Sequence, residues 1–129
     1  MPASWRGRMS RKRQNAEKRG HLAEFIAFIY LRLKGYRLLA RRFRSPQGEV
    51  DLIMRRRDVT AFIEVKARGT RDQGVEAVTT TQSRRIAAAA RFWMARDKLS
   101  NRNFCRFDIV VVNAYFWPQH IENAFPGDG

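Results

Sequence analysis

Three of the chain's twelve acidic residues, Glu49, Asp51 and Glu64, fall within a stretch of sixteen residues. All three lie in segments with alternating apolar residues, where acidic side chains are normally disfavoured. Lys66 follows two residues after Glu64. Two carboxylates could hold a divalent cation, and a nearby lysine could assist a water in attacking a phosphodiester. These residues are therefore the first candidates for chemistry.

The pairing of two strands would bring these side chains together. A two-residue hairpin loop at positions 57–58 makes cross-strand partners sum to 115. Asp51 then faces Glu64 and Glu49 faces Lys66, all on one face of the hairpin. Facing carboxylates repel, and a bound cation would offset that repulsion. The alternative is a solvated sheet face whose ion pairs contribute little, and the spacing alone leaves both readings open.

A helix precedes these strands. Apolar residues recur at helical spacing and Gly35 supplies a stop signal, so we predict a helix from about residue 15 to 34. Glu24 lies opposite the main apolar stripe of this helix, which by itself indicates an exposed glutamate. The stripe consists of Leu22, Phe25, Ile26, Ile29 and Leu33.

The remaining patterns predict a mixed α/β fold. The second strand alternates, with Val50, Leu52 and Met54 on one side and Glu49, Asp51 and Ile53 on the other. Asp108 opens an apolar run, so we expect it to be structural, with Arg106 or a backbone cap as its partner. The predicted elements are strands at 36–45, 49–56, 60–68 and 107–112, a short strand near Ile121, a loop at 69–80, and a helix at 82–98 capped by one of Thr79, Thr80 and Thr81.

Two segments carry a family resemblance. Gly48-Glu49-Val50-Asp51-Leu52-Ile53 and Phe62-Ile63-Glu64-Val65-Lys66-Ala67-Arg68 resemble the PD-(D/E)XK signature of restriction-endonuclease-like nucleases. More closely, they resemble the small bacterial YraN-type family, which is related in fold to archaeal Holliday junction resolvases. The resemblance covers about residues 20 to 125 and includes Gly20, Glu24, Arg106-Phe107-Asp108 and Asn123-Ala124-Phe125.

The resemblance implies a fold and a site. The fold is a restriction-endonuclease-like αβββαβ core with a mixed sheet flanked by helices. In the implied site, Asp51 and Glu64 bind Mg²⁺ or Mn²⁺, Lys66 assists the water and Glu24 completes the acidic cluster. Glu49 is either a supporting partner or an ion-pair partner of Lys66. Gln82 falls where related nucleases carry a polar or basic residue, often lysine in this family. Related resolvases act as dimers, which implies a possible homodimer.

The charge of the chain points to a polyanionic partner. The 26 Lys and Arg residues outnumber the 12 acids and give a net charge of +14. Nucleic acid is the expected partner, DNA being what the resemblance to nucleases implies, and an anionic membrane surface is the main alternative. We expect residues 1–19 to form a basic flexible arm and residues 20–129 to form a single domain. The predicted nucleic-acid contacts are Arg41, Arg42, Arg44, Arg55, Arg56, Arg57 and Arg68.

Several classes of protein are excluded. The single cysteine, Cys105, excludes an internal disulfide framework and a zinc site built on paired cysteines. We expect no membrane segment, no secretory signal and a cytoplasmic location. The leading hypothesis is a Mg²⁺-dependent endonuclease acting on branched or structured DNA. The alternatives are a non-catalytic nucleic-acid-binding protein on a nuclease-like fold, and a basic adaptor at a membrane surface or ribosome.

Overall fold

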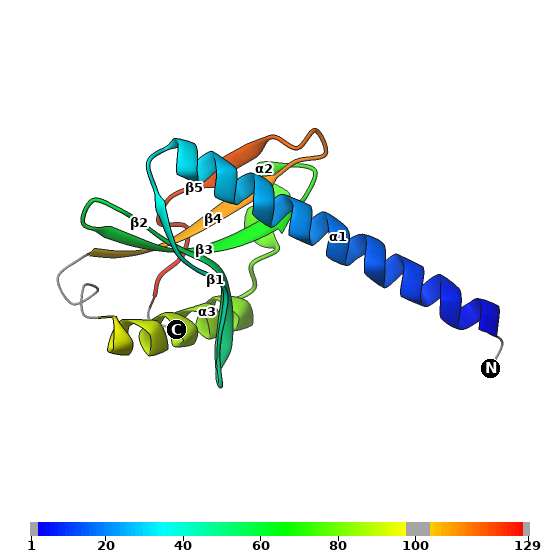
Figure 1. Ribbon diagram of the computed structural model, residues 1–129, viewed down its shortest axis with the longest axis horizontal. Helices are drawn as coiled ribbons and strands as arrows, with labels where there is room; N and C mark the ends of the chain where they lie inside the picture. Colours follow the sequence, from blue (N-terminus) through cyan, green and yellow to red (C-terminus); the bar gives the residue numbers. More distant parts are fainter. Residues whose placement is uncertain (1–2, 98–103, 128–129) are drawn as a thin grey trace.

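A five-stranded sheet lies between two long helices in the computed structural model of the protein, which describes residues 3–97 and 104–127, with side chains from Lys12 onward (Figure 1). One helix covers each face of the sheet. The elements are α1 (Ala3–Leu33), β1 (Arg37–Ser45), β2 (Gly48–Arg56), β3 (Val59–Ala67), α2 (Arg71–Glu76), α3 (Thr80–Arg96), β4 (Phe104–Val112) and β5 (Pro118–Ile121).

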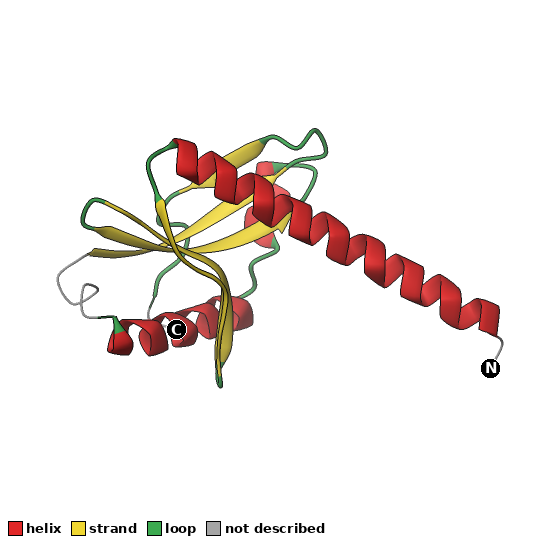
Figure 2. Cartoon of the chain, in the orientation of Figure 1, coloured by secondary structure: helices red, strands yellow, loops and turns green. Residues whose placement is uncertain are grey.

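The sheet confirms the predicted mixed α/β fold with its αβββαβ core. Its strand order is β1-β2-β3-β4-β5, and only β3 and β4 pair in parallel. The chain crosses between these two strands through α2 and α3 (Figure 2). The predicted strand near Ile121 is also confirmed, since β5 closes the far edge of the sheet. In the described part of the chain, no helix is both long and apolar enough to cross a membrane.

The face that α1 buries differs from the prediction. Ala23, Ala27 and Leu31 pack against the sheet, whereas most of the predicted apolar stripe is exposed, up to 83% for Leu33. Small side chains let the helix approach the sheet closely, and the larger ones are left on the outside. Because Glu24 follows Ala23, it lies beside the packed face, and the prediction of an outward-facing Glu24 is wrong.

This packing predicts an asymmetry in stability. Ala27→Leu adds volume at a fully buried position, so the free energy of unfolding should fall by about 1–3 kcal/mol. Leu33→Ala, at an exposed position, should change it by less than about 0.5 kcal/mol. Urea denaturation of the two variants measures both values. The opposite order would contradict the observed helix orientation.

Two other segments differ from the predictions. The helix α1 begins at Ala3 and not near residue 15, so most of the predicted arm is helical, in keeping with its many good helix formers. Flexibility of this arm stays a prediction. The predicted loop at 69–80 contains α2, which starts with a capping box between Thr70 and Gln73. Thr79 caps α3 and is one of the three threonines predicted as possible caps.

The hairpin formed by β1 and β2 bends at its outer part. Leu52 and Met54 pack beneath α1, but Val50 packs with Ile53 beneath α3, so the predicted alternation is wrong at Val50. The β2–β3 ladder ends at the pair Leu52 and Ile63. Beyond that pair the backbones of β2 and β3 are no longer paired, and the hairpin turns toward the first half of α3 (Figure 1).

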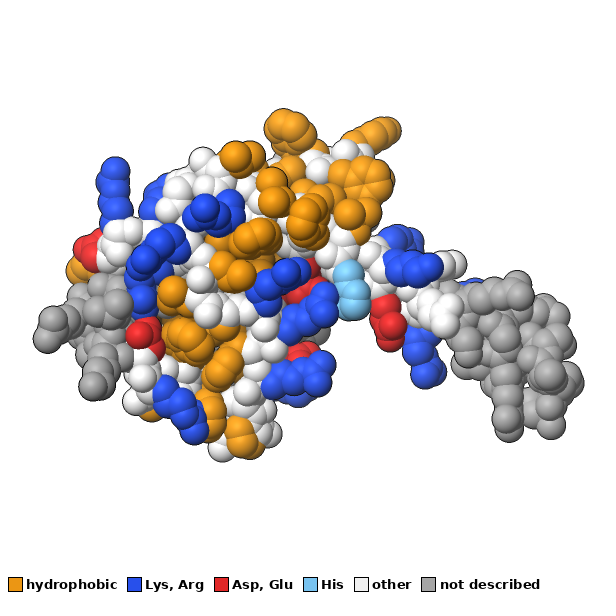
Figure 3. Space-filling view, viewed as in Figure 1, with side chains coloured by type: hydrophobic (Ala, Val, Ile, Leu, Met, Phe, Trp, Pro, Cys, Tyr) orange, Lys and Arg blue, Asp and Glu red, His pale blue; other side chains and the backbone are white. Residues whose placement is uncertain are grey.

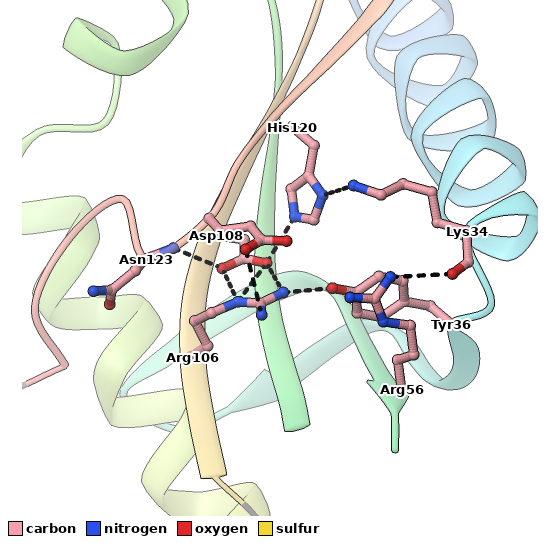
Figure 4. A network of polar contacts seen from close by, with 8 residues as sticks. Lys34, Tyr36, Arg56, Arg106, Asp108, His120 and Asn123 are labelled. Carbon is pink, nitrogen blue, oxygen red and sulfur yellow. Dashed lines mark hydrogen bonds and ion pairs between the residues drawn. The ribbon is translucent and has the colours of Figure 1, made fainter. Parts of the chain in front are cut away.

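A buried ionic network joins the end of α1 to β4 and β5 (Figure 4). The carboxylate of Asp108 is fully buried and accepts hydrogen bonds from Arg106 Nε at 2.8 Å and from the backbone of Asn123 at 3.0 Å. His120 Nε2 lies 2.7 Å from the same carboxylate, and Lys34 Nζ lies 2.8 Å from His120 Nδ1. The predicted structural role of Asp108 is thus confirmed, with Arg106 and a backbone cap both present.

Candidate active site

The site forms where β2 and β3 separate. Their ladder runs from Arg56 and Val59 to Leu52 and Ile63, and these partners sum to 115 as predicted. The ladder stops one residue before Asp51, so the predicted direct pairing of Asp51 with Glu64 is absent from it. Instead, Oδ2 of Asp51 accepts a hydrogen bond from the backbone N–H of Val65 at 2.8 Å. The Asp51 side chain thus takes the place of a backbone partner for Val65, and its carboxyl group points toward β3.

Glu64 and Lys66 extend from β3 toward the start of α3. Gln82 Nε2 donates to Oε1 of Glu64 at 2.9 Å, and Lys66 Nζ lies 3.4 Å from the same oxygen. The side chains of Glu64 and Lys66 are only 8% and 15% exposed. The alternative of a solvated sheet face is therefore wrong for these residues. Gln82, despite departing from the family's lysine, contacts the site directly.

Burial and mutual repulsion shift the pKa values of the two carboxyl groups. Burial, followed by the charge of Asp51, raises the pKa of Glu64 to about 8. Burial also raises the pKa of Asp51 to about 6, although its hydrogen bond from Val65 acts in the opposite direction. Each carboxyl group also shifts the pKa of the other. The pair therefore shares a proton near neutral pH, and it is poised to exchange that proton for another positive charge.

A glycine brings the first residue of β2 against the backbone of α3. A Cβ built on Gly48 would lie 2.0 Å from the carbonyl oxygen of Arg85, so no larger residue fits without moving the helix. Glu49 and Asp51 follow directly, and Gln82 and Arg85 lie on the same helix. The close approach thus sets the distance between the acidic strand and α3.

We expect Gly48→Ala to lower the free energy of unfolding by about 1–3 kcal/mol, because backbone atoms cannot yield as side chains do. Gly20→Ala is the matched control. Nothing lies within 4 Å of a Cβ at Gly20, and alanine favours the helix, so this variant should gain up to about 1 kcal/mol. Thermal and urea denaturation test both, and equal stabilities would contradict the close approach.

Residues of β2, β3 and the start of α3 line a cavity of about 270 Å³. Arg85 and the threonines at the start of α3 belong to it; the sequence marked the threonines only as candidate helix caps and did not mark Arg85. Arg85 follows Gln82 by three residues on a helix, so the two share a face, which is the signal that could have found it. The lining consists of Glu49, Asp51, Glu64, Thr79, Thr81, Gln82 and Arg85.

Two predicted site residues are held by arginines. Arg42 Nη2 lies 3.1 Å from Glu24 Oε2, and Arg42 Nε donates to both carboxylate oxygens of Glu24. Glu24 is close enough to raise the pKa of Asp51, although more weakly than burial does. Glu49 pairs with Arg44 at 3.3 Å rather than with Lys66. Both glutamates thus lie beside the carboxyl pair and are not part of it.

The predicted nucleic-acid contacts differ in their exposure to solvent. Arg55 is buried, with its guanidinium bonded to Thr60 and Asp97, so we remove it from this set. Arg56 is half-buried and lies over the ring of Tyr36. The exposed members are Arg41, Arg42, Arg44, Arg57 and Arg68, and for these a contact with nucleic acid stays a prediction.

Comparison with known proteins decides the family. A model of the family described as "Uncharacterised protein family UPF0102" matches residues 23–112. The chain belongs to the UPF0102 family. A UPF0102 protein of Chelativorans sp. is 50% identical over 113 residues, covering 88% of this chain and 91% of the relative. Another, of Mesorhizobium japonicum, is 49% identical over 120 residues, covering 93% and 96%. The YraN-type resemblance is thereby confirmed.

The matched region of this UPF0102 chain includes Glu24, the carboxyl pair, Lys66 and Gln82. Its donor set fits a hard divalent cation, because the buried carboxyl group of Glu64 and the half-buried one of Asp51, both of raised pKa, face one cavity. Asp51 and Glu64 would hold such an ion. Within residues 12–97 and 104–127, no three His, Cys, Asp or Glu side chains form a group that could hold a metal. Glu24 as a third ligand therefore stays a prediction.

Proposed function

We propose that this UPF0102 protein is a divalent-metal-dependent endonuclease that hydrolyses phosphodiester bonds of DNA, with branched or structured DNA as its substrate. The observation that carries the proposal is the largely buried carboxyl pair of Asp51 and Glu64 with the ammonium group of Lys66 beside it. Like charges buried together are costly, and a fold retains them where a function requires them.

Each residue has a role in this proposal. Mg²⁺ or Mn²⁺ on Asp51 and Glu64 would supply an activated water and screen the charge of the phosphate. Lys66 orients the attacking water and neutralises charge on the reacting phosphate. Gln82 fixes the orientation of Glu64 through its hydrogen bond. Arg85 and the amino end of α3 offer positive charge to the phosphate entering the cavity.

The net charge of +14 supports a polyanionic substrate. Contacts to phosphates supply affinity without reading base sequence, which suits recognition of DNA shape. A homodimer and a cytoplasmic location belong to this proposal as further expectations. Light scattering on the purified protein tests the first, and fractionation of cells tests the second.

Cleavage of labelled DNA is the decisive experiment. Four-way junction, flap, single-stranded and fully paired DNA are each incubated with the protein and Mg²⁺, Mn²⁺ or EDTA. We expect metal-dependent cleavage of the branched substrates, lost in Asp51→Asn and in Lys66→Met. Asp72→Asn is the matched control, since that carboxylate is 85% exposed, and it should cleave normally. Binding without cleavage in any metal, unaffected by both site variants, would leave a non-catalytic nucleic-acid-binding protein on a nuclease-like fold.

A further inference from the structure

A second cavity, of about 390 Å³, lies on the α1 side of the sheet. Its walls are α1, the residues that follow β3 and the segment that follows β4. Leu22 and Val112 contribute apolar surface, and Phe116 closes one side. None of its lining residues belongs to the cavity of the carboxyl pair. We call this cavity the α1 groove.

The α1 groove combines apolar surface with positive charge. Arg19 and Arg68 line it, both are exposed, and no acidic residue is among its lining. An uncharged apolar partner would strip water from two guanidinium groups without replacing it. A nucleotide satisfies both features, since its base has a flat apolar face and its phosphate pairs with arginine. The chemistry of the groove therefore selects a nucleotide.

The aromatic side of the groove is held in place by its own loop. Phe116 adopts a left-handed backbone conformation, with φ of 62°. The side-chain oxygen of Asn113 accepts hydrogen bonds from the backbone N–H groups of Tyr115 and Trp117, at 2.9 and 3.1 Å. The backbone N–H of Phe116 donates to the carbonyl of Asn113 at 3.0 Å. This loop therefore presents Phe116, 58% exposed, at a fixed position rather than folding it into the core.

The surface around the groove is unusually apolar for so basic a chain. Hydrophobic side chains gather over the second half of α1 and the β4–β5 loop (Figure 3). Tyr115 and Trp117 flank Phe116 and are 89% and 66% exposed. Aromatic side chains next to arginines are the usual platform for unpaired bases.

The groove and the carboxyl pair are connected through β3. Glu64 lies on this strand and Arg68 follows its end, so the two are four positions apart, a span of at most about 14 Å. One strand of duplex DNA rises 3.4 Å per nucleotide. The groove lies on the α1 side of the sheet and the carboxyl pair on its α3 side, so a DNA strand that contacts both must pass around the end of β3, over a distance of several nucleotides. A paired base is stacked within the duplex and cannot enter, whereas an unpaired base can.

We propose that the α1 groove binds an unpaired nucleotide, with the base against Phe116 and Leu22 and the phosphate between Arg19 and Arg68. The proposal rests on the proposed function in taking DNA as the ligand and in placing the cut strand near Glu64. It gives the protein a means of preferring flaps, junctions and single-stranded ends over intact duplex without reading sequence.

Binding measured without cleavage tests the groove. Fluorescence anisotropy in EDTA compares a duplex carrying a short single-stranded tail with a blunt duplex of the same length. We expect the wild-type protein to bind the tailed DNA at least fivefold more tightly. Phe116→Ala should lose that preference by about 5- to 100-fold and leave blunt-duplex affinity unchanged. Phe116→Trp should retain it.

Phe104→Ala is the matched control. Phe104 is also an exposed phenylalanine, 72% accessible, but it begins β4, at the opposite end of that strand from Val112. This variant should bind both DNAs as the wild type does. Because both side chains are largely exposed, melting temperatures should stay within a few degrees, which establishes that each variant folds.

Two results would overturn the proposal. One is equal affinity of the wild-type protein for tailed and blunt DNA, and the other is an equal effect of Phe116→Ala and Phe104→Ala. If the proposed function is wrong, the result is different: the protein still prefers tailed DNA in EDTA, but it cleaves no DNA with any metal. If Phe116→Ala still cleaves DNA and binds the tailed DNA as tightly as the wild type does, the nucleotide site in the groove is rejected and the proposed nuclease function is retained.

Discussion

Glu64→Gln is expected to abolish cleavage while making the metal-free protein more stable. The wild-type carboxyl group has its pKa raised to about 8 by burial and by Asp51, so ionising it in the folded state is costly. Each unit of pKa shift corresponds to about 1.4 kcal/mol. Allowing for the coupling with Asp51, the neutral glutamine should raise the free energy of unfolding by about 3 kcal/mol at pH 8.5. Urea denaturation in EDTA measures this gain.

The sign of the pH dependence follows from the raised pKa. Between about pH 4.5 and 8 the folded state holds a proton on Glu64 that the unfolded state has released. The stability of the metal-free wild-type protein should therefore fall as the pH rises through this range. In Glu64→Gln the slope should be shallower, with the residual slope due to Asp51. A wild-type protein of constant stability from pH 5 to 8.5 would contradict the raised pKa.

Adding a divalent cation should reverse the order of stability. Mg²⁺ or Mn²⁺ binds the ionised pair and is expected to stabilise the wild-type protein, with release of protons near pH 7. Glu64→Gln retains one carboxylate and should gain less. Asp72→Asn removes an exposed carboxylate and should follow the wild type at every pH and metal concentration. If the cation changes all three proteins equally, the pair is not its binding site.

Local patterns predicted the carboxyl pair and its scaffold. The loop at 57–58 fixed the register of β2 and β3, because a hairpin's register depends on its own turn. The start of α3 was predicted from threonines that can cap a helix, and Thr79 does so. The end of the ladder could not be predicted, since it depends on the side chain of Asp51 replacing a backbone partner.

Contacts between distant segments explain the remaining errors. Helical periodicity marks the larger apolar side chains of α1, but the sheet selected the face with Ala23 and Ala27, which permits closer packing. Arg55 was predicted at the surface because it precedes a charged turn, yet it is buried through a partner, Asp97, at the far end of α3. The sequence around α1 does not show how closely the sheet packs against it, and the sequence around Arg55 does not show that Asp97 lies beside it.

Asp108→Ala is expected to produce the largest loss of stability, about 3–5 kcal/mol. The change leaves Arg106 and His120 without the carboxylate that both contact in a buried position, and it frees the backbone N–H of Asn123. Asp108→Asn keeps the shape and some of the hydrogen bonds, so it should fold with an intermediate loss if the alanine variant does not. Asp72→Ala, at an exposed position, should change stability by less than about 0.5 kcal/mol.

The pH dependence of this network has the opposite sign to that of the carboxyl pair. Burial acts to raise the pKa of Asp108, but hydrogen bonds from His120, Arg106 and Asn123 outweigh it and hold the pKa below its usual value. Its contribution is therefore complete above about pH 4 and is lost as the pH falls through the lowered pKa. Asp108→Asn should flatten the acid limb of the stability curve, whereas Glu64→Gln flattens the neutral and alkaline limb. A single variant that flattened both would mean that the two clusters titrate as one, against their separation on opposite faces of the sheet.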